Sequence, residues 1–171
     1  MLYILGVDAH RYQAVNPAIN PDEPKFHDYI LRFVKDRAIG HLAEEMNDEL
    51  LRRENNAHES VCRKVAKILG ITLSMCEPTS QEKQAIGYID KSWEEFVRED
   101  DTGCNDKINA AYSSFHRKQW PLRENFWFEK LKPHLRDNIL FICGAQHADR
   151  FSKLLQDKGI KNQVICMRWK P

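Results

Sequence analysis

The chain has 171 residues, of which 42% are hydrophobic and 30% charged, so it is long enough to bury a core and too apolar to be disordered. Its 26 basic and 25 acidic residues leave a net charge of +1, which gives no sign of a bulk attraction to nucleic acid or to an anionic membrane. No stretch approaches the roughly 20 apolar residues of a membrane span, and the first residues do not resemble a signal peptide. The five cysteines lack CxxC spacing, so we expect a cytoplasmic globular protein with reduced thiols.

The first half of the chain alternates between predicted strands and helices. Short apolar runs predict three strands, over residues 2–7, 39–43 and 71–76. Apolar residues at helical spacing predict a helix over 25–36, and a second helix is expected between Ser60, a good cap, and Gly70. Three prolines indicate that 11–24 is a loop. The alternation favours a parallel sheet whose strands are connected by helices.

A stretch from about 80 to 135 interrupts this alternation and is predicted to be a helical insertion over the carboxyl edge of the strands. Ser92 and Glu95 have the spacing of a capping box, which indicates a helix after Ser92. Apolar residues over 108–115 indicate another helix, and Pro121 suits the first turn of a third.

Two further strands are expected after this insertion. Five consecutive apolar residues over 139–143 indicate a strand at 138–143 that is buried on both faces. A helix ending at Gly159 follows, and then a last strand at 164–167. We therefore predict a single α/β domain over 1–171, with a mainly parallel sheet of about five strands and helices on both faces.

Two histidines follow two of the predicted strands. Gly144 is expected to make the tight turn that leads to His147, and Gly6 the turn that leads to His10. The carboxyl ends of parallel strands share one edge, where open α/β sheets bind their ligands. We predict that His10 and His147 lie in one site, on strands that are adjacent or one strand apart.

Other side chains that can bind a metal or transfer a proton are expected at the same edge. They are Asp8, Glu44, Glu45, Glu77 and Gln146. Histidine with carboxylate can hold a divalent metal, or act as a general base with an orienting acid. Taken alone, each of these residues is more simply explained as a turn residue or a solvated loop residue. The functional interpretation therefore rests on four strands that each bring such a side chain to the same edge of the sheet. The remaining histidines are expected to be surface or packing residues: His27, His41, His58, His116 and His134.

Arg123 and Cys143 each allow two interpretations. Arg123 shares a helix face with Trp120 and Trp127, so its side chain either covers aromatic surface or points a guanidinium into the site. In the second case it would bind a carboxylate or phosphate, or stabilise an oxyanion. Cys143 lies in an apolar run, which favours buried packing over a role as nucleophile.

Taken together, these motifs resemble the TraB/Tiki superfamily, which includes erythromycin-esterase-like and ChaN-like proteins. The resemblance is carried by the strand that ends in Gly-x-x-His at 144–147, the early strand with Gly6 and His10, and the glutamate after the second strand. It identifies His10, Glu45 (or Glu44), Arg123 and His147 as the family's site residues. It implies a hydrolase-type site, metal-dependent in the Tiki branch and metal-free in the esterase branch, whereas ChaN-like members suggest haem or iron binding.

The chain departs from the family pattern in three ways. The first turn reads Gly-x-x-x-His, and Arg123 begins Arg-Glu-Asn-Phe-Trp where the family has Arg-Asn/Asp-x-x-Met. The chain is also shorter than is usual, so part of the substrate-binding region is either missing or supplied by a second subunit. A homo-oligomer is thus an open alternative.

Two main classes of function follow. In the first, a hydrolase cleaves an ester or amide of a small-molecule or peptide substrate: His10 or His147 activates water, Glu45 or Glu44 orients or shares the proton, and Arg123 stabilises negative charge. In the second, a protein without catalysis holds an anionic small molecule or nucleotide by the turn over 144–147 and by Arg123. A structural subunit is a third class. The carboxylates favour the hydrolase, because they would repel an anion. The expected cofactor is either none or a divalent metal ion, with a slight preference for none, since Arg123 would place a positive charge beside the ion.

Overall fold

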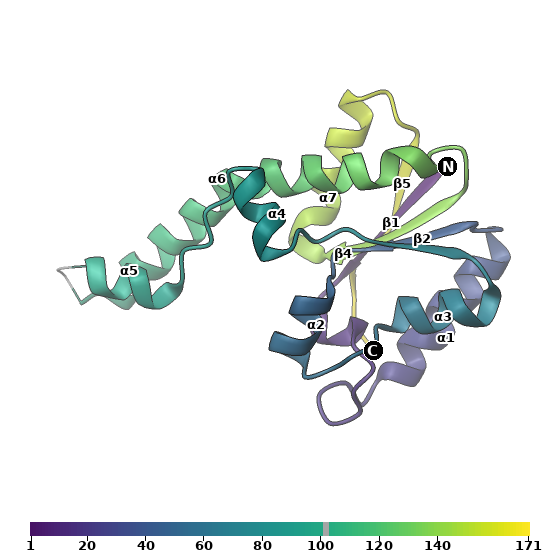
Figure 1. The fold of residues 1–171 in the computed structure, drawn as a ribbon, viewed down its shortest axis with the longest axis horizontal. Coiled ribbons are helices and arrows are strands. Elements are labelled where there is room, and N and C mark those ends of the chain that lie inside the picture. Colours follow the sequence, from purple (N-terminus) through teal and green to yellow (C-terminus); the bar gives the residue numbers. More distant parts are fainter. Residues whose placement is uncertain (101–102) are drawn as a thin grey trace. The chain divides into compact units, whose positions relative to one another are not determined.

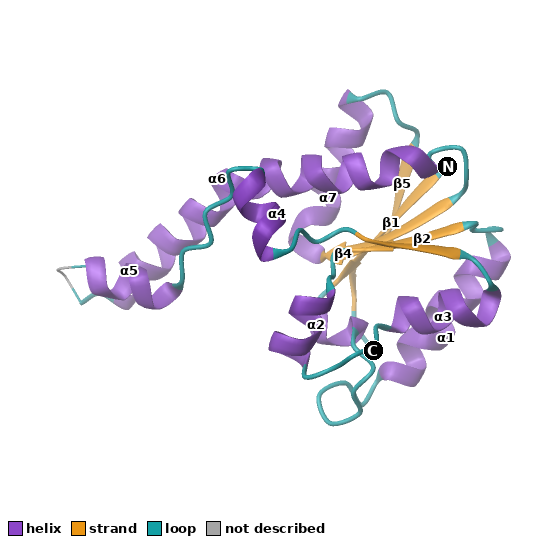
Figure 2. Ribbon diagram, viewed as in Figure 1, coloured by secondary structure: helices purple, strands orange, loops and turns teal. Residues whose placement is uncertain are grey.

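A five-stranded parallel sheet in the order β3-β2-β4-β1-β5 forms the centre of the protein in the computed structural model, which describes residues 1–100 and 103–171 (Figure 1). The strands are β1 (Leu2–Val7), β2 (His41–Glu44), β3 (Thr72–Met75), β4 (Ile139–Gly144) and β5 (Asn162–Trp169). Every neighbouring pair is parallel, and Figure 2 shows the strands fanning with the usual twist. The predicted α/β class with a five-stranded parallel sheet is confirmed.

Helices cover both faces of this sheet. The helical segments around it are η1 (His10–Gln13), α1 (Glu23–Asp36), α2 (Asp48–Asn55), α3 (Val61–Leu69), η2 (Lys132–His134) and α7 (Ala145–Asp157). In Figure 1, α1 and α3 lie side by side on one face, and α7 packs on the other. Ser60 caps α3 by accepting from the backbone N–H of Arg63, and Gly70 ends it in the left-handed conformation, as the sequence predicts.

The two faces bury different side chains because successive residues of a strand point in opposite directions. One face packs aliphatic residues of the strands, such as Leu42 and Ile142, against α1 and α3. On the other face, Phe141 contacts Phe151 of α7 and Trp127, with ring centroids 4.9 and 5.5 Å apart. Trp127 is fully buried and is the largest side chain of this layer.

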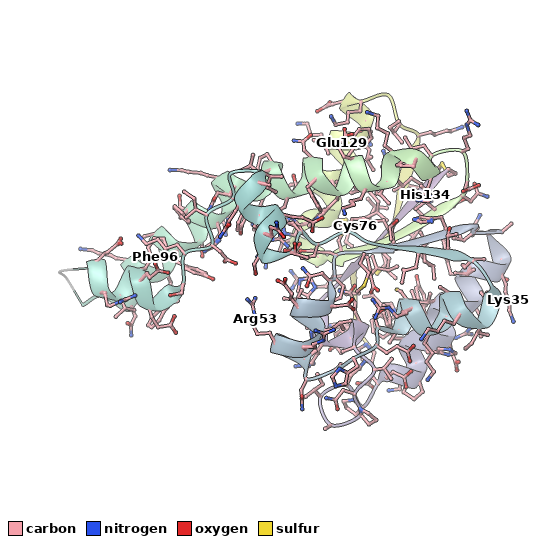
Figure 3. The ribbon with its side chains drawn as sticks, in the orientation of Figure 1. Lys35, Arg53, Cys76, Phe96, Glu129 and His134 are labelled. Carbon is pink, nitrogen blue, oxygen red and sulfur yellow. The ribbon has the colours of Figure 1, made fainter. Side chains whose placement is uncertain are left out.

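The chain divides into two compact units, Met1–Glu77 with Trp127–Pro171, and Pro78–Phe126. The second unit contains α4 (Ser80–Ala85), α5 (Trp93–Glu99) and most of α6 (Asn105–Leu131). Its aromatic cluster joins Phe96 of α5 to Tyr112 and Phe115 of α6, with centroid distances of 5.6 and 5.5 Å (Figure 3). A helical segment was expected over about 80–135. The single domain, and the packing of this segment over the strand edge, stay predictions.

Three local features were either predicted wrongly or not predicted at all. Pro121 does not begin a helix but lies inside α6, which runs without a break where two helices were expected. The helix tolerates this proline because Pro121 lacks only one backbone N–H, and a helix of this length keeps its many other backbone hydrogen bonds. The second missed feature is α2, which lies in a polar stretch; the side chain of Asn47 caps it by accepting from Leu50 N at 2.7 Å. The third is η1, a helical turn within the predicted loop.

Two further predictions can be compared with the structure. All five cysteines are free thiols, and Cys62, Cys76 and Cys143 are buried. Within the described residues, no helix combines the length and apolarity that crossing a membrane requires.

Candidate functional site

The histidines at 10 and 147 follow two neighbouring strands. β1 and β4 pair in parallel, and Val7 is the partner of Gly144 at their carboxyl ends. His10 opens η1 directly after β1, and His147 is the third residue of α7, which begins where β4 ends. The predicted adjacency of these strands is confirmed, and it brings the two imidazoles to one edge of the sheet.

Glu45 lies between the two imidazoles. It follows β2 and remains bound to β4, since its N–H donates to Ile142 O at 2.8 Å. Its Oε2 accepts from the backbone N–H of Gly144 at 2.7 Å. Its Oε1 is 3.8 Å from Nε2 of His10 and 3.8 Å from Nε2 of His147. These two distances exceed a direct hydrogen bond but let the carboxylate stabilise a positive charge on either ring.

Gly6 and Gly144 are needed because there is no room for a side chain at either position, and not because the backbone needs a special conformation there. Gly144 has φ −57°, which any residue adopts, so the expected turn chemistry was wrong. A Cβ at Gly144 would lie 3.2 Å from His10 Nε2 and 3.5 Å from Glu45 Oε2. Gly6 lies inside β1, not in a turn, and a Cβ there would overlap the backbone O of Met167 at 2.2 Å. Both glycines therefore permit a close approach, one of a side chain and one of a strand.

The three side chains differ in their exposure to solvent. The His10 side chain is 36% exposed, whereas those of His147 and Glu45 are 7% and 1% exposed. The His147 ring packs against the ring of Trp127 at right angles, with centroids 5.0 Å apart. His10 is therefore the solvent-exposed member of the three, while His147 and Glu45 are buried.

Gln13 is a site residue that the sequence did not indicate. Its side chain is fully buried, and its Nε2 lies 3.0 Å from Nδ1 of His10. Residues three apart on a 3₁₀ helix eclipse each other, so η1 itself sets this contact. The spacing from His10 to Gln13 is the signal that could have found it, had the segment been predicted as helical.

Glu44, the alternative to Glu45, belongs to the other face of the sheet. Ser60 donates its hydroxyl hydrogen bond to Glu44 Oε1, and the side chain is fully buried. Burial raises the pKa of Glu44 from 4.5 to about 7, although the Ser60 hydrogen bond and the charge of Arg63 lower it. Burial also raises the pKa of Cys62, further increased by neighbouring Glu44. The Cys76 thiol, labelled in Figure 3, has its pKa raised mainly by burial and next by Glu44.

The other candidates differ in their surroundings. Asp8 pairs with Arg168 at 3.3 Å, and Gln146 is exposed. Glu77 is buried, and its backbone O accepts from Asn47 Nδ2 at 3.2 Å. Arg123 belongs to α6 in the second unit, so its predicted role stays a prediction.

His41 is a packing residue. Its two ring nitrogens lie 2.6 Å from Thr72 Oγ1 and 3.0 Å from Ser74 Oγ, and its ring stacks on His134 with centroids 3.7 Å apart. Burial and, to a smaller extent, neighbouring His134 lower the pKa of His41 to about 4, against an opposite effect of Asp137. It is therefore neutral at physiological pH.

Across residues 1–100 and 103–171, no group of three or more His, Cys, Asp or Glu side chains is arranged to hold a metal ion. Glu45 already uses Oε2 to accept from Gly144, and its Oε1 faces both imidazoles.

No family model, no curated protein and no solved structure matches this chain. The resemblance to the TraB/Tiki superfamily stays a prediction. The function is inferred from the geometry of His10, Glu45 and His147.

Proposed function

We propose that the protein is a hydrolase that cleaves an ester or amide bond, with water activated between His10, Glu45 and His147. The observation that supports this proposal is that one buried carboxylate oxygen lies at the same distance, 3.8 Å, from Nε2 of both imidazoles. A carboxylate in this position stabilises the imidazolium that forms when a histidine takes a proton from water. Hydrolysis needs that proton transfer.

In the proposed reaction, water attacks the carbonyl carbon while one imidazole takes its proton. The other imidazole donates a hydrogen bond to the carbonyl oxygen, where negative charge develops. The bond from carbon to the leaving oxygen or nitrogen then breaks, and the imidazolium returns its proton to the leaving group. Glu45 keeps its hydrogen bond from the N–H of Gly144 and faces the imidazolium with Oε1.

The exposure of the site residues and the predicted resemblance support the proposed substrate class. His10 is the exposed member of the three, so the scissile bond is proposed to bind over His10 rather than beside buried His147. A small-molecule or peptide substrate is proposed. Arg123 lies in the second unit, and its stabilisation of the developing negative charge stays a prediction of the TraB/Tiki resemblance.

The alternative function, an anion-binding protein, is disfavoured by Glu45. The N-terminus of α7 would be the place for an anion, because its N–H groups have no partner within the helix. The carboxylate of Glu45 already accepts from Gly144 there. A phosphate or nucleotide would have to displace or approach a buried negative charge.

The test is a screen of chromogenic esters and anilides with the wild-type chain and two variants, Glu45→Gln and His147→Gln. General acid–base catalysis contributes about 10²–10⁴-fold to a rate, so each variant should lose about that factor in kcat/KM. Glutamine keeps the volume of glutamate and still accepts from Gly144.

His58→Gln is the matched control, because His58 is exposed and donates no side-chain hydrogen bond to the site residues. Its activity should stay within about twofold of wild type. Turnover that survives in both Glu45→Gln and His147→Gln would refute the proposal. A thermal shift produced by phosphate, without turnover of any substrate in the panel, would support the anion-binding protein instead.

A further inference from the structure

The buried side chain of Gln13 and the partly exposed ring of His10 form a pair that determines where the proton of His10 lies. We infer that Gln13 holds the proton of neutral His10 on Nε2, so that Nε2 is a hydrogen-bond donor on the side of Glu45. The use of this donor to bind the carbonyl oxygen of a substrate rests on the proposed function, whereas the position of the proton does not.

Both neighbours of the His10 ring demand the same tautomer. The amide nitrogen of Gln13, 3.0 Å from Nδ1, can only donate, so Nδ1 must accept and carries no proton. On the other side, Nε2 faces Oε1 of Glu45 at 3.8 Å, and an ionised carboxylate can only accept. A neutral ring with its proton on Nε2 accepts from Gln13 and directs its N–H toward the carboxylate, whereas the opposite tautomer would set two donors, Gln13 and Nδ1–H, against each other.

The reverse orientation of the Gln13 amide is less favourable. As the side chain lies, its Oε1 is buried and has no hydrogen-bond partner among the described residues. Turning the amide by 180° would bring Oε1 to His10 and bury the NH₂ group without an acceptor. Buried N–H groups without a partner are rarer in proteins than buried carbonyl oxygens without one, so the observed orientation is preferred.

In the proposed reaction this contact makes Gln13 a positioning residue, because Gln13 acts on the substrate only through the ring of His10. His10 donates from Nε2 to the carbonyl oxygen, and its greater exposure places this donor next to bound substrate.

The experiment measures the tautomer of His10 by nitrogen-15 NMR in the full chain, with the His10 signals identified by their loss in a His10→Asn variant. In wild type, Nδ1 should be the unprotonated nitrogen. In Gln13→Glu, a carboxylate accepts at Nδ1, so the ratio of the two tautomers should shift by about tenfold or more toward protonated Nδ1. Gln13→Met removes the donor and should leave a mixture. Gln156→Met, on the exposed surface of α7, is the matched control and should match wild type.

The inference is overturned if wild-type His10 carries its proton on Nδ1, or if Gln13→Glu leaves the tautomer ratio unchanged. If Gln13→Glu does not fold by circular dichroism, the wild-type spectrum and Gln13→Met carry the test. A wild-type spectrum as expected, in a protein that hydrolyses none of the esters and amides, would refute the proposed function but not the position of the proton.

Discussion

Glu44 and Glu45 are neighbours in the chain, yet they lie in opposite chemical environments. Glu44 is buried against Ser60 and Cys62 on the face that α3 covers, where burial raises its pKa to about 7. Glu45 is equally buried, but it accepts from a backbone N–H and faces two imidazoles. The difference shows that burial alone does not determine the role of a carboxylate. The partners on its own side of the sheet do.

The largest expected effect separates the two carboxylates by activity. Glu45→Gln should reduce kcat/KM for hydrolysis by about 10²–10⁴-fold, because it removes the negative charge that stabilises the imidazolium. Glu44→Gln should change it by less than about threefold, because Glu44 lies on the other face of the sheet. Steady-state kinetics of both variants on one ester measures the contrast. Equal losses in the two variants would erase the distinction between the two faces.

The largest effect on the free energy of unfolding is expected at Trp127, which packs against His147. Trp127→Ala removes a fully buried ring that packs on His147, Phe141 and Phe151, and should cost about 3–5 kcal/mol of unfolding free energy. Trp93→Ala is the matched control, because Trp93 is an exposed residue of the second unit and should cost less than about 1 kcal/mol. Urea unfolding measures both. A small effect at Trp127 would contradict the packing of this face.

The free energy of unfolding should depend on pH because the pKa of Glu44 is raised in the folded protein. Its pKa is higher in the folded protein, about 7, than its ordinary value of 4.5, so the folded state holds the proton more tightly. Its contribution is fully present below pH 4.5 and is lost as the pH rises through 7. The lost contribution is of the order of 3 kcal/mol at most.

Glu44→Gln removes this dependence, so the difference between its stability and that of wild type should change with pH mainly between 4.5 and 7. The effect is best seen as a difference, because the lowered pKa of His41 acts with the opposite sign: stability from neutral His41 is lost as the pH falls from 6.5 to about 4. Urea unfolding at several pH values measures it. A difference that is constant from pH 4 to 8 would show that Glu44 is not protonated in the folded protein.

The smallest expected effect concerns the hydroxyl that joins α3 to Glu44. Ser60→Ala removes the cap of α3 and the hydrogen bond to Glu44 Oε1, and should cost about 1–2 kcal/mol. Ser60→Thr keeps a hydroxyl and should recover most of that loss. Thermal unfolding of the two variants compares them. No loss in Ser60→Ala would mean that the hydroxyl stabilises neither partner.

The sequence by itself determined the layers of this protein. Apolar runs such as 139–143 and the alternation of strands with capped helices were enough to predict a parallel α/β sheet with β1 close to β4, because period and capping are local properties of the chain. The same reasoning placed His10 and His147 at one edge, since each follows a strand directly.

Only the tertiary structure decided which residues meet there. The sequence left Glu44 and Glu45 as alternatives, and the register of β2 in the sheet sent one to each face. The role of Gln13 could not be predicted, because a single 3₁₀ turn leaves no periodic pattern in the sequence. The contact of Gln13 with His10 depends on the fold of that turn. The glycines were predicted from sequence for the wrong reason: the space that Gly144 leaves for His10 exists only once β1 and β4 are paired.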